Sequence, residues 1–233
     1  MNIQAVIFDL DNTLTHRDQS IVRYAQNFLQ YYSSCLVEQV TSSVSLLEQT
    51  VNIIRRIDQG GYPKKEFLTH PSIAASVGYA LTQELLWSKT PPLEELTHYW
   101  FQQFGLAAVA MQGAVELLQY LQGQQYKLAV ISNGGHATRL KILEGLAFSH
   151  YFDEIISSEL VGVSKPKPEI FLQTCQRLQV QPAQSLYIGD HPINDYAGAT
   201  GAGLNAILLN GFHQDVEHIP HRIDSLQQVL DYL

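Results

Sequence analysis

Two aspartates follow the first apolar run of the chain at a spacing that suits chemistry. Ala5 to Phe8 is typical of a short buried strand, and Asp9 and Asp11 come directly after it. Side chains alternate along a strand with a period of two, so these two carboxylates start on the same side. Open α/β sheets bind ligands at the carboxyl ends of their strands, although Asp also begins many solvated turns. The pair alone leaves a ligand site and an ordinary turn equally open.

A polar segment rich in glycine follows a second apolar run. Ser132, Asn133, Gly134 and Gly135 come after Leu128 to Ile131 and precede a helical pattern. A hydroxyl group, flexible glycines and the free N–H groups of a helix start can together bind a phosphate group. The same residue types form ordinary helix caps, and taken alone this segment favours the cap.

Lys165 lies in the segment Ser-Lys-Pro-Lys-Pro, in which two prolines stiffen the backbone. Pro166 biases Lys165 toward an extended conformation, and Pro168 suits the first turn of the helix that follows. An ammonium group held on such a loop could contact a carboxylate and a phosphate oxygen together. Lys167 is better explained as a solvated charge.

Two more acids, Asp190 and Asp195, follow the apolar run Leu186 to Ile188. Mg²⁺ prefers carboxylate oxygens and usually keeps several waters, so Asp190 could join Asp9 in a magnesium site. One glycine–aspartate pair after a strand is weak evidence. Four suitable clusters in this order, each at a strand end or on a loop, are strong evidence for a single site.

The apolar runs before these clusters predict a parallel sheet, because they have the continuous hydrophobicity of strands buried on both faces. A further run covers Ala206 to Leu209, and a weaker one covers Glu154 to Ser157. Helical periodicity alternates with the strands over residues 114–121, 137–146, 169–178 and 225–233. This alternation predicts an α/β fold with a doubly wound, Rossmann-like parallel-sheet core.

The segment between the first strand and the rest of the sheet carries helical periodicity and no convincing strand. Its periodic stretches cover 21–32, 43–57 and 93–104, and glycine and proline clusters separate them. The sequence therefore predicts two parts. Residues 1–15 and 107–233 form the α/β core, and residues 16–106 form a helical insertion.

Composition narrows the class of protein and of partner. The chain has 233 residues, of which 45% are hydrophobic and 15% charged, and its formal net charge is -8. These values predict a globular protein with a sizeable core, and they disfavour a nucleic-acid partner because like charges repel. No signal-like amino terminus and no apolar stretch of about 20 residues is present, so we expect a cytoplasmic protein without a membrane partner. Cys35 and Cys175 are interpreted as small buried residues in a reducing compartment.

In their order and residue types, the four clusters resemble the motifs of the haloacid dehalogenase superfamily of aspartyl-phosphate hydrolases. Asp9-Leu-Asp11-Asn-Thr matches the first motif of that family, and Ser132 matches the second. Lys165 matches the third, and Gly189-Asp190 through Asp195 matches the fourth. The resemblance covers the predicted core, and it implies that the helical insertion is a mobile cap of the C1 type.

The resemblance also implies a mechanism. Asp9 would be the nucleophile that forms a phosphoaspartate, and Asp11 would be the acid toward the leaving alcohol and then the base for water. Mg²⁺ would bind Asp9, the main-chain carbonyl of Asp11 and Asp190, and it would offset the repulsion between an anionic nucleophile and an anionic phosphate.

The remaining motif residues would bind or orient. Ser132, the Asn133 amide and Lys165 would hold the phosphoryl oxygens. Asp195 would orient a metal-bound water or Lys165 rather than bind the metal directly. We therefore expect a magnesium-dependent phosphatase that acts on a small phosphorylated metabolite as a monomer or a homodimer.

Three alternatives stay open at this point. A haloacid dehalogenase uses the same nucleophile on carbon and has neither the second aspartate nor magnesium, so Asp11 counts against it. A phosphomutase with a similar cap would return the phosphoryl group to the substrate. A binding protein on the same fold is disfavoured because all four motifs are intact. The physiological substrate and the cap residues that select it are not specified by these motifs.

Other charged residues have simpler interpretations. Cations in and near the insertion could meet an anionic substrate, but we interpret most of them as parts of a solvated surface. These cations are Arg17, Arg23, Arg55, Arg56, Lys64 and Lys65. The histidines His213, His218 and His221 match no zinc motif and are interpreted as surface residues.

Overall fold

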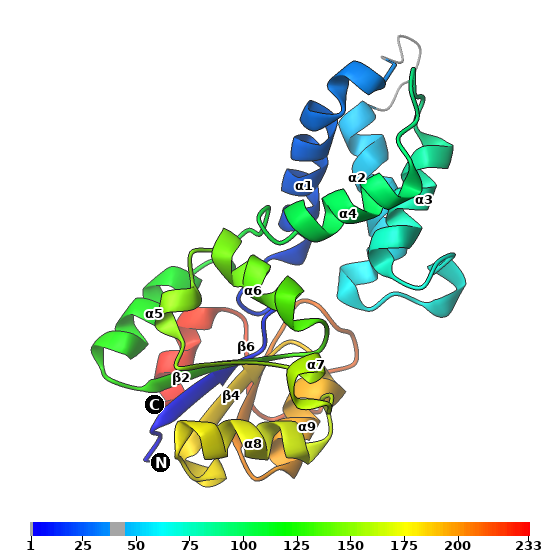
Figure 1. Ribbon diagram of the computed structural model, residues 1–233. Helices are drawn as coiled ribbons and strands as arrows, with labels where there is room; N and C mark the ends of the chain where they lie inside the picture. The colour runs from blue at the N-terminus through cyan, green and yellow to red at the C-terminus, as the bar shows by residue number, and fades with distance from the viewer. Residues whose placement is uncertain (1, 38–44) are drawn as a thin grey trace. The chain divides into compact units, whose positions relative to one another are not determined.

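The main feature of the computed structural model, which describes residues 2–37 and 45–233, is a parallel sheet of six strands (Figure 1). The strand order is β3-β2-β1-β4-β5-β6, and every neighbouring pair is parallel. The strands are β1 (Ala5–Phe8), β2 (Lys127–Ser132), β3 (Glu154–Ser157), β4 (Ser185–Gly189), β5 (Asn205–Leu209) and β6 (Arg222–Ile223). The predicted parallel-sheet core is confirmed. The sequence pattern did not predict β6, because two residues are too few to show a period.

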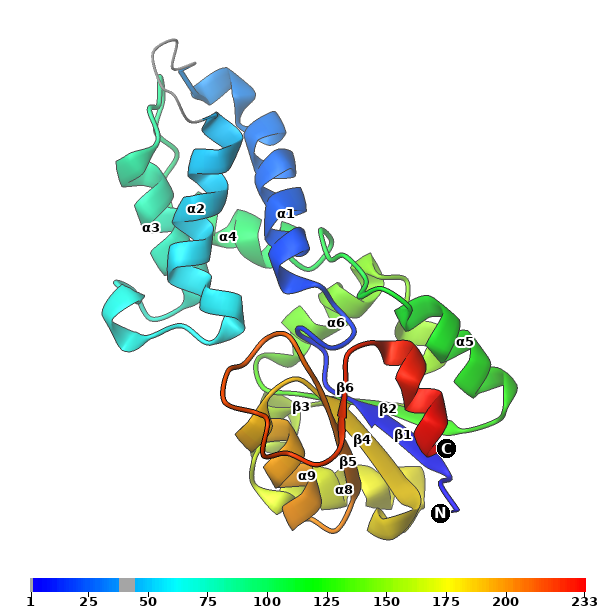
Figure 2. The same ribbon diagram turned by 180° about the vertical axis from the view of Figure 1, so that it is seen from behind.

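Helices cover both faces of this sheet, as the doubly wound prediction requires (Figures 1 and 2). The α-helices of this part of the chain are α5 (Ala114–Gly123), α6 (His136–Gly145), α7 (Ser158–Val161), α8 (Pro168–Leu178) and α9 (Gly198–Gly201). On one face, Ala5 and Ile7 of β1 pack in a buried cluster with Ile170 and Phe171 of α8. α9 lies on the same side as α8, and α5 lies on the opposite side.

Shorter helical turns connect these elements. They are η4 (Ser149–Tyr151), η5 (Pro182–Gln184), the π-helical η6 (Pro192–Ala197) and η7 (Leu226–Tyr232). The predicted α-helices over 114–121, 137–146 and 169–178 correspond to α5, α6 and α8. The prediction of an α-helix over 225–233 is wrong, because η7 is a 3-10 helix, which has tighter turns than an α-helix.

Residues 17–109 form a second compact unit made of helices. Its α-helices are α1 (Arg17–Tyr31), α2 (Leu46–Asp58), α3 (Ile73–Glu84) and α4 (Leu93–Gln103). Its 3-10 turns are η1 (Ser33–Cys35), η2 (Gln59–Gly61) and η3 (Lys65–Phe67). The first two residues of the predicted helix 43–57 lie outside the described residues. The sequence pattern missed α3, whose small residues are buried on several sides and leave little amphipathic contrast.

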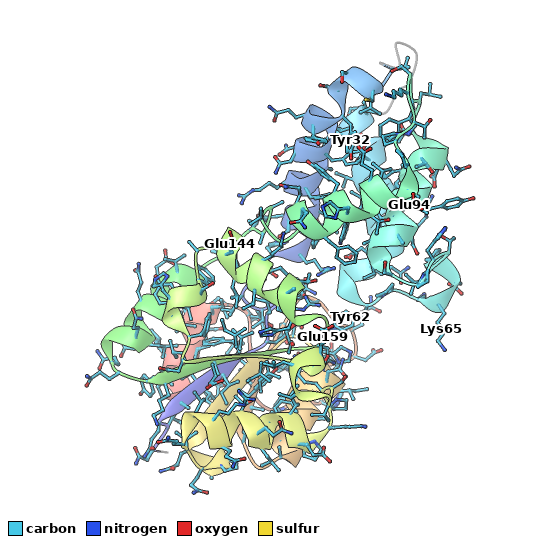
Figure 3. All side chains as sticks on the ribbon, in the orientation of Figure 1. Tyr32, Tyr62, Lys65, Glu94, Glu144 and Glu159 are labelled. Carbon is cyan, nitrogen blue, oxygen red and sulfur yellow. The ribbon has the colours of Figure 1, made fainter. Side chains whose placement is uncertain are left out.

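Aromatic side chains form the centre of this helical unit. Tyr24 of α1 lies against Trp100 and Phe104, with ring centroids 4.9 and 5.6 Å away. Trp100 and Phe104 stack at 4.2 Å with an interplanar angle of 7°. Tyr32 also lies in this unit (Figure 3) and donates a hydrogen bond to Glu95 at 3.1 Å. Packing of this kind gives residues 17–109 a core of their own.

A buried ion pair corrects one sequence interpretation. Arg17 is not a solvated cation: its Nε and Nη2 donate to the two carboxylate oxygens of Asp58, at 2.8 and 2.7 Å, and both side chains are buried. A bidentate pair satisfies both charges inside the unit, which explains how an arginine can be buried there.

The other cations of the unit lie at its surface, as interpreted from the sequence. Arg55 pairs with Asp18 at 2.6 Å and Arg56 pairs with Glu84, and all four side chains are exposed. Exposed pairs of this kind contribute little to stability. Four further cations are exposed, namely Arg23, Lys64, Lys65 and Lys89, and Figure 3 shows Lys65 pointing away from the helices.

The chain divides into two compact units, Met1–His16 with Ala110–Leu233 and Arg17–Val109, whereas the predicted insertion covers 16–106. Among the described residues, no helix combines the length and the apolar character needed to cross a bilayer. Cys175 is buried, as expected, and burial raises the pKa of its thiol. Cys35 is only half-buried, so the prediction of a buried side chain is wrong there, because Cys35 ends a short 3-10 turn near the surface.

Candidate active site

Asp9 lies at the carboxyl end of the central strand β1. Its N–H donates a hydrogen bond to the carbonyl of Ile188 on β4, at 2.8 Å, so the backbone of Asp9 is held between neighbouring strands. Its side chain is buried, and Oδ1 accepts a hydrogen bond from Lys165 Nζ at 2.5 Å. The structure thus brings together two side chains that are 156 positions apart in the sequence.

The Lys165 ammonium group is enclosed by oxygen atoms. Its Nζ donates to Asp9 Oδ1 at 2.5 Å, to Asp195 Oδ1 at 2.6 Å, and to the Tyr187 hydroxyl and the Ile131 carbonyl at 3.0 Å each. Burial alone would lower the pKa of Lys165, but attraction to Asp195 and Asp9 raises that pKa above its ordinary value. The side chain is therefore a fixed positive charge at neutral pH.

Asp195 connects this lysine to the loop after β4. Its Oδ1 also accepts a hydrogen bond from the Tyr187 hydroxyl, at 2.9 Å, and its Oδ2 accepts one from the N–H of His191, also at 2.9 Å. A Cβ atom at Gly189 would lie 2.4 Å from Cγ of Asp195, closer than real atoms approach. The glycine before Asp190 is therefore needed so that Asp195 can lie against the end of β4.

Three buried carboxylates gather at this edge of the sheet. One oxygen from each of Asp9, Asp190 and Asp195 lies within 4.8 Å of the others. Burial is the main cause that raises the pKa of Asp9, repulsion from Asp195 and Asp190 adds to it, and attraction to Lys165 opposes it. Burial likewise raises the pKa of Asp190, with Asp195 adding to the effect and His213 opposing it. Attraction to Lys165 therefore does not offset the cost of burying the Asp9 and Asp190 carboxylates in their ionised form.

This cluster fits a divalent metal ion. Oδ1 of Asp190 is buried and has no hydrogen-bond partner among the residues that the structure describes. A buried carboxylate oxygen without a partner is costly, and a cation would satisfy it. Hard cations prefer such carboxylate oxygens. The donor set and the excess negative charge therefore both match a bound cation.

Asp11 has a different partner. Its Oδ2 accepts a hydrogen bond from Nη1 of Arg139 at 2.6 Å, and the exposed fractions of the two side chains are 15% and 13%. Because β1 ends at Phe8, the alternation of a strand does not extend to Asp11, and Asn12 follows in the left-handed region with a φ of 59°. The Asp11 side chain lies outside the carboxylate cluster. A metal contact through its main-chain carbonyl stays a prediction.

Ser132 and Asn133 lie at the end of β2, next to β1. Ser132 is buried. The Asn133 side chain donates to the carbonyl of Lys165 at 3.1 Å and accepts from the N–H of Lys165 at 2.9 Å. This reciprocal pair ties the two loops together. The Asn133 side chain thus holds Lys165, and phosphate binding by its main-chain amide stays a prediction.

Sequence reasoning missed three residues that the structure places in or beside this site. Tyr187 was treated only as part of a strand. Because a buried hydroxyl group needs a hydrogen-bond partner, a tyrosine within a buried strand is a signal that could have identified it. Arg139 is one of two basic residues in the helical pattern 137–146, and nothing in its spacing marks it. His213 was interpreted as a surface residue, which is wrong: its Nε2 lies 3.3 Å from Oδ2 of Asp190. The segment after β5 brings it there, whereas His218 and His221 are exposed as expected.

Both the sequence and the fold of this chain are similar to those of known hydrolases. A family model described as haloacid dehalogenase-like hydrolase matches residues 3–203. A glyceraldehyde 3-phosphate phosphatase from Methanopyrus kandleri is 24% identical over 216 residues, covering 92% of this chain and 88% of the relative. A phosphoglycolate phosphatase from Aquifex aeolicus is 25% identical, covering 94% of this chain and 90% of that protein. The HAD-hydrolase YfnB from Bacillus subtilis, solved with magnesium, has a TM-score of 0.70 at 22% identity, covering 100% of this chain and 99% of that one.

Proposed function

The chain belongs to the haloacid dehalogenase-like hydrolase family, and from this premise we propose that it is a magnesium-dependent phosphatase. It hydrolyses a small phosphate monoester through a phosphoaspartate intermediate. The observation that carries this proposal is the contact of the Asp9 carboxylate with the Lys165 ammonium beside the buried acids Asp190 and Asp195. Phosphoryl transfer needs a nucleophile, a fixed cation and a metal-binding cluster, and these residues lie together at one edge of the sheet.

Asp9 is proposed as the nucleophile. One of its carboxylate oxygens attacks phosphorus, a bond forms between that oxygen and phosphorus, and the bond from phosphorus to the leaving oxygen breaks. Asp11 gives its proton to the leaving oxygen, so an alcohol departs. In the second half, Asp11 takes a proton from the water that attacks phosphorus, inorganic phosphate forms and Asp9 is regenerated.

Lys165, Ser132 and Asn133 are proposed to bind the phosphoryl oxygens. The Lys165 ammonium stays charged and is already fixed by Asp195, so it can offset negative charge on the transferring group without first reorganising. Ser132 supplies a hydroxyl at the end of β2, and Asn133 supplies its main-chain N–H while its side chain holds the Lys165 loop.

Magnesium is proposed to bind Asp9, the main-chain carbonyl of Asp11 and Asp190, where it would offset repulsion between the nucleophile and the phosphate. The unpartnered Oδ1 of Asp190 supports this assignment. Asp195, which accepts hydrogen bonds from Lys165, Tyr187 and His191, is proposed to orient Lys165 instead of binding the metal directly.

A small phosphorylated metabolite is proposed as the substrate, because the relatives named above are phosphatases of two such compounds. We further propose that the helical insertion, residues 16–106 by prediction, is a C1-type cap that binds the leaving group. The protein would act in the cytoplasm as a monomer or a homodimer, with no nucleic-acid or membrane partner.

Release of inorganic phosphate from p-nitrophenyl phosphate tests this function. Purified protein is expected to release phosphate and p-nitrophenol in equal amounts with Mg²⁺, to stop when EDTA is added, and to recover when excess Mg²⁺ is restored. Phosphate that moves to an added alcohol acceptor in place of water would support the phosphomutase alternative. Halide release from a 2-haloacid without phosphatase activity would support the dehalogenase alternative, and full activity in EDTA would contradict the metal assignment.

Thermal unfolding gives a test of the metal that needs no substrate. The raised pKa values of Asp9 and Asp190 mean that the folded, metal-free protein holds these protons more tightly than the unfolded chain. Its stability therefore falls as pH rises from the ordinary carboxyl value of 3.8 toward the raised values. Mg²⁺ binds the ionised acids, so it should raise the melting temperature more at about pH 7.5 than at about pH 5. An equal shift at both pH values, or none, would contradict binding at this cluster.

A further inference from the structure

Arg139 lies in the first turn of α6 and its side chain reaches the site from a different element than any motif residue. Nη1 donates to Oδ2 of Asp11 at 2.6 Å, across 128 positions of sequence. Both side chains are mostly buried, with exposed fractions of 13% and 15%. A partly desolvated arginine–carboxylate contact at this distance holds both groups more firmly than a surface ion pair.

A second contact fixes the guanidinium from its other side. Gly134, the second residue after Ser132, has a φ of +131°, and a Cβ atom built there would lie 2.2 Å from Nη2 and 3.0 Å from Nε of Arg139. The guanidinium therefore lies directly against the main chain of Gly134, in space that any side chain would fill. Arg139 is held between the segment after β2 and the segment after β1.

The start of α6 is itself anchored, so the backbone of Arg139 has a defined position. The Ser158 hydroxyl accepts a hydrogen bond from the N–H of Gly134 at 2.9 Å. The Glu159 carboxylate, labelled in Figure 3, accepts one from the N–H of His136 at 2.7 Å. Both acceptors come from α7, which follows the neighbouring strand β3.

We propose that Arg139 is a positioning residue that holds the Asp11 carboxyl group where it exchanges a proton with the leaving oxygen. This inference rests on the proposed function, in which Asp11 is the acid. Nη1 contacts Oδ2 of that carboxyl group. The proton of the Asp11 carboxyl group passes to the leaving oxygen as the bond from that oxygen to phosphorus breaks, and a proton from the attacking water replaces it. Without Arg139 the Asp11 side chain populates other rotamers, and in a smaller fraction of molecules its carboxyl group is aligned with the leaving oxygen.

The test compares two phosphate esters under single-turnover conditions, with enzyme in excess. Phenyl phosphate has a poor leaving group that needs a proton, whereas 2,4-dinitrophenyl phosphate has a good one that does not. Arg139→Ala is expected to slow phenol release about 10- to 100-fold and dinitrophenol release by less than about 3-fold, because only the first reaction depends on an aligned acid. Arg139→Lys, which keeps a donor, should recover part of the lost rate.

A double variant separates this role from others. Asp11→Asn should show the same preference for the activated ester, and Asp11→Asn combined with Arg139→Ala should be no slower than Asp11→Asn alone. Arg177→Ala is the matched control. Arg177 is an exposed arginine of α8 that pairs with Glu154 at 3.4 Å, and its loss should leave both rates unchanged. Circular dichroism spectra show whether Arg139→Ala folds. If it does not, Arg139→Gln takes its place in the same measurements.

Specific results would overturn the inference. Equal slowing of both esters by the Arg139 variants would mean that Arg139 acts on the common phosphoryl group. A rise in KM with no change in the single-turnover rate, or a further loss in the Asp11→Asn background, would mean that it binds substrate independently of Asp11. If Asp11→Asn itself fails to discriminate between the esters, the acid role of Asp11 is wrong and this inference falls with it. If only the Arg139 variants fail to discriminate, the proposed function stands and this inference alone is wrong.

Discussion

Asp9→Asn is expected to lower kcat by at least about four orders of magnitude on every phosphate ester, because an amide cannot replace a carboxylate as nucleophile. The fold should survive. Burial is the main cause that raises the pKa of Asp9, so a neutral side chain of the same shape costs less to bury in the metal-free protein, and Asp195 remains as the partner of Lys165. Steady-state kinetics and thermal melting measure the two effects separately.

Asp215→Asn is the matched control for this variant. Asp215 is an exposed aspartate of the same compact unit, and its φ of 57° lies in the left-handed region that Asn also tolerates. It should leave kcat and the melting temperature unchanged. If Asp9→Asn retained a tenth or more of the activity while Asp215→Asn behaved as the wild type, Asp9 would not be the nucleophile.

Lys165→Ala is expected to lower kcat/KM about 10²- to 10³-fold on every ester, because it removes a fixed positive donor to the common phosphoryl group. It should also destabilise the metal-free protein, by about 3–5 kcal/mol, because Asp9 and Asp195 lose the partner that offsets their buried charge. Lys165→Met retains the chain volume and separates loss of charge from loss of packing. A panel of phosphate esters and thermal melting give the measurements.

Lys167→Ala is the control on the same loop, since Lys167 is exposed two residues further on. Lys167→Ala should change neither kcat/KM nor the melting temperature. A Lys165→Ala variant that altered only the ranking of substrates, with the best substrate turned over normally, would contradict the proposed contact with the phosphoryl group.

The sheet could be predicted from the sequence because each buried strand leaves a local signal. The run before Asp190, for example, is buried along its whole length, and Gly189 and Asp190 follow it, so both the strand and the place of Asp190 at its carboxyl end follow from neighbouring residues. The same holds for Ser132 at the end of β2 and for Asp9 directly after β1. Parallel strands then bring these ends to one edge of the sheet, as the grouping of Asp9 with Asp190 illustrates.

Contacts made by loops and by the middle of elements could not be predicted in this way. The pair of Asp11 and Arg139 depends on how the chain turns after β1 and on the start of α6, and neither turn is set by a periodic pattern. His213 reaches Asp190 through the conformation of the segment after β5. Arg17 is buried only because Asp58, far along the chain, supplies both oxygens for its guanidinium. Each of these contacts depends on tertiary structure, and local propensity carries no information about it.

Chemical identification of the phosphorylated residue tests whether Asp9 is the nucleophile. Wild-type protein is mixed with Mg²⁺ and a phosphate ester that it hydrolyses, and the reaction is quenched in acid during turnover. The protein is then treated with borohydride, which reduces an aspartyl phosphate to homoserine. Peptide mapping by mass spectrometry then locates the change. We expect homoserine at position 9, and none in a sample without substrate. Turnover with the modification at Ser132, at a histidine, or at no residue would contradict it.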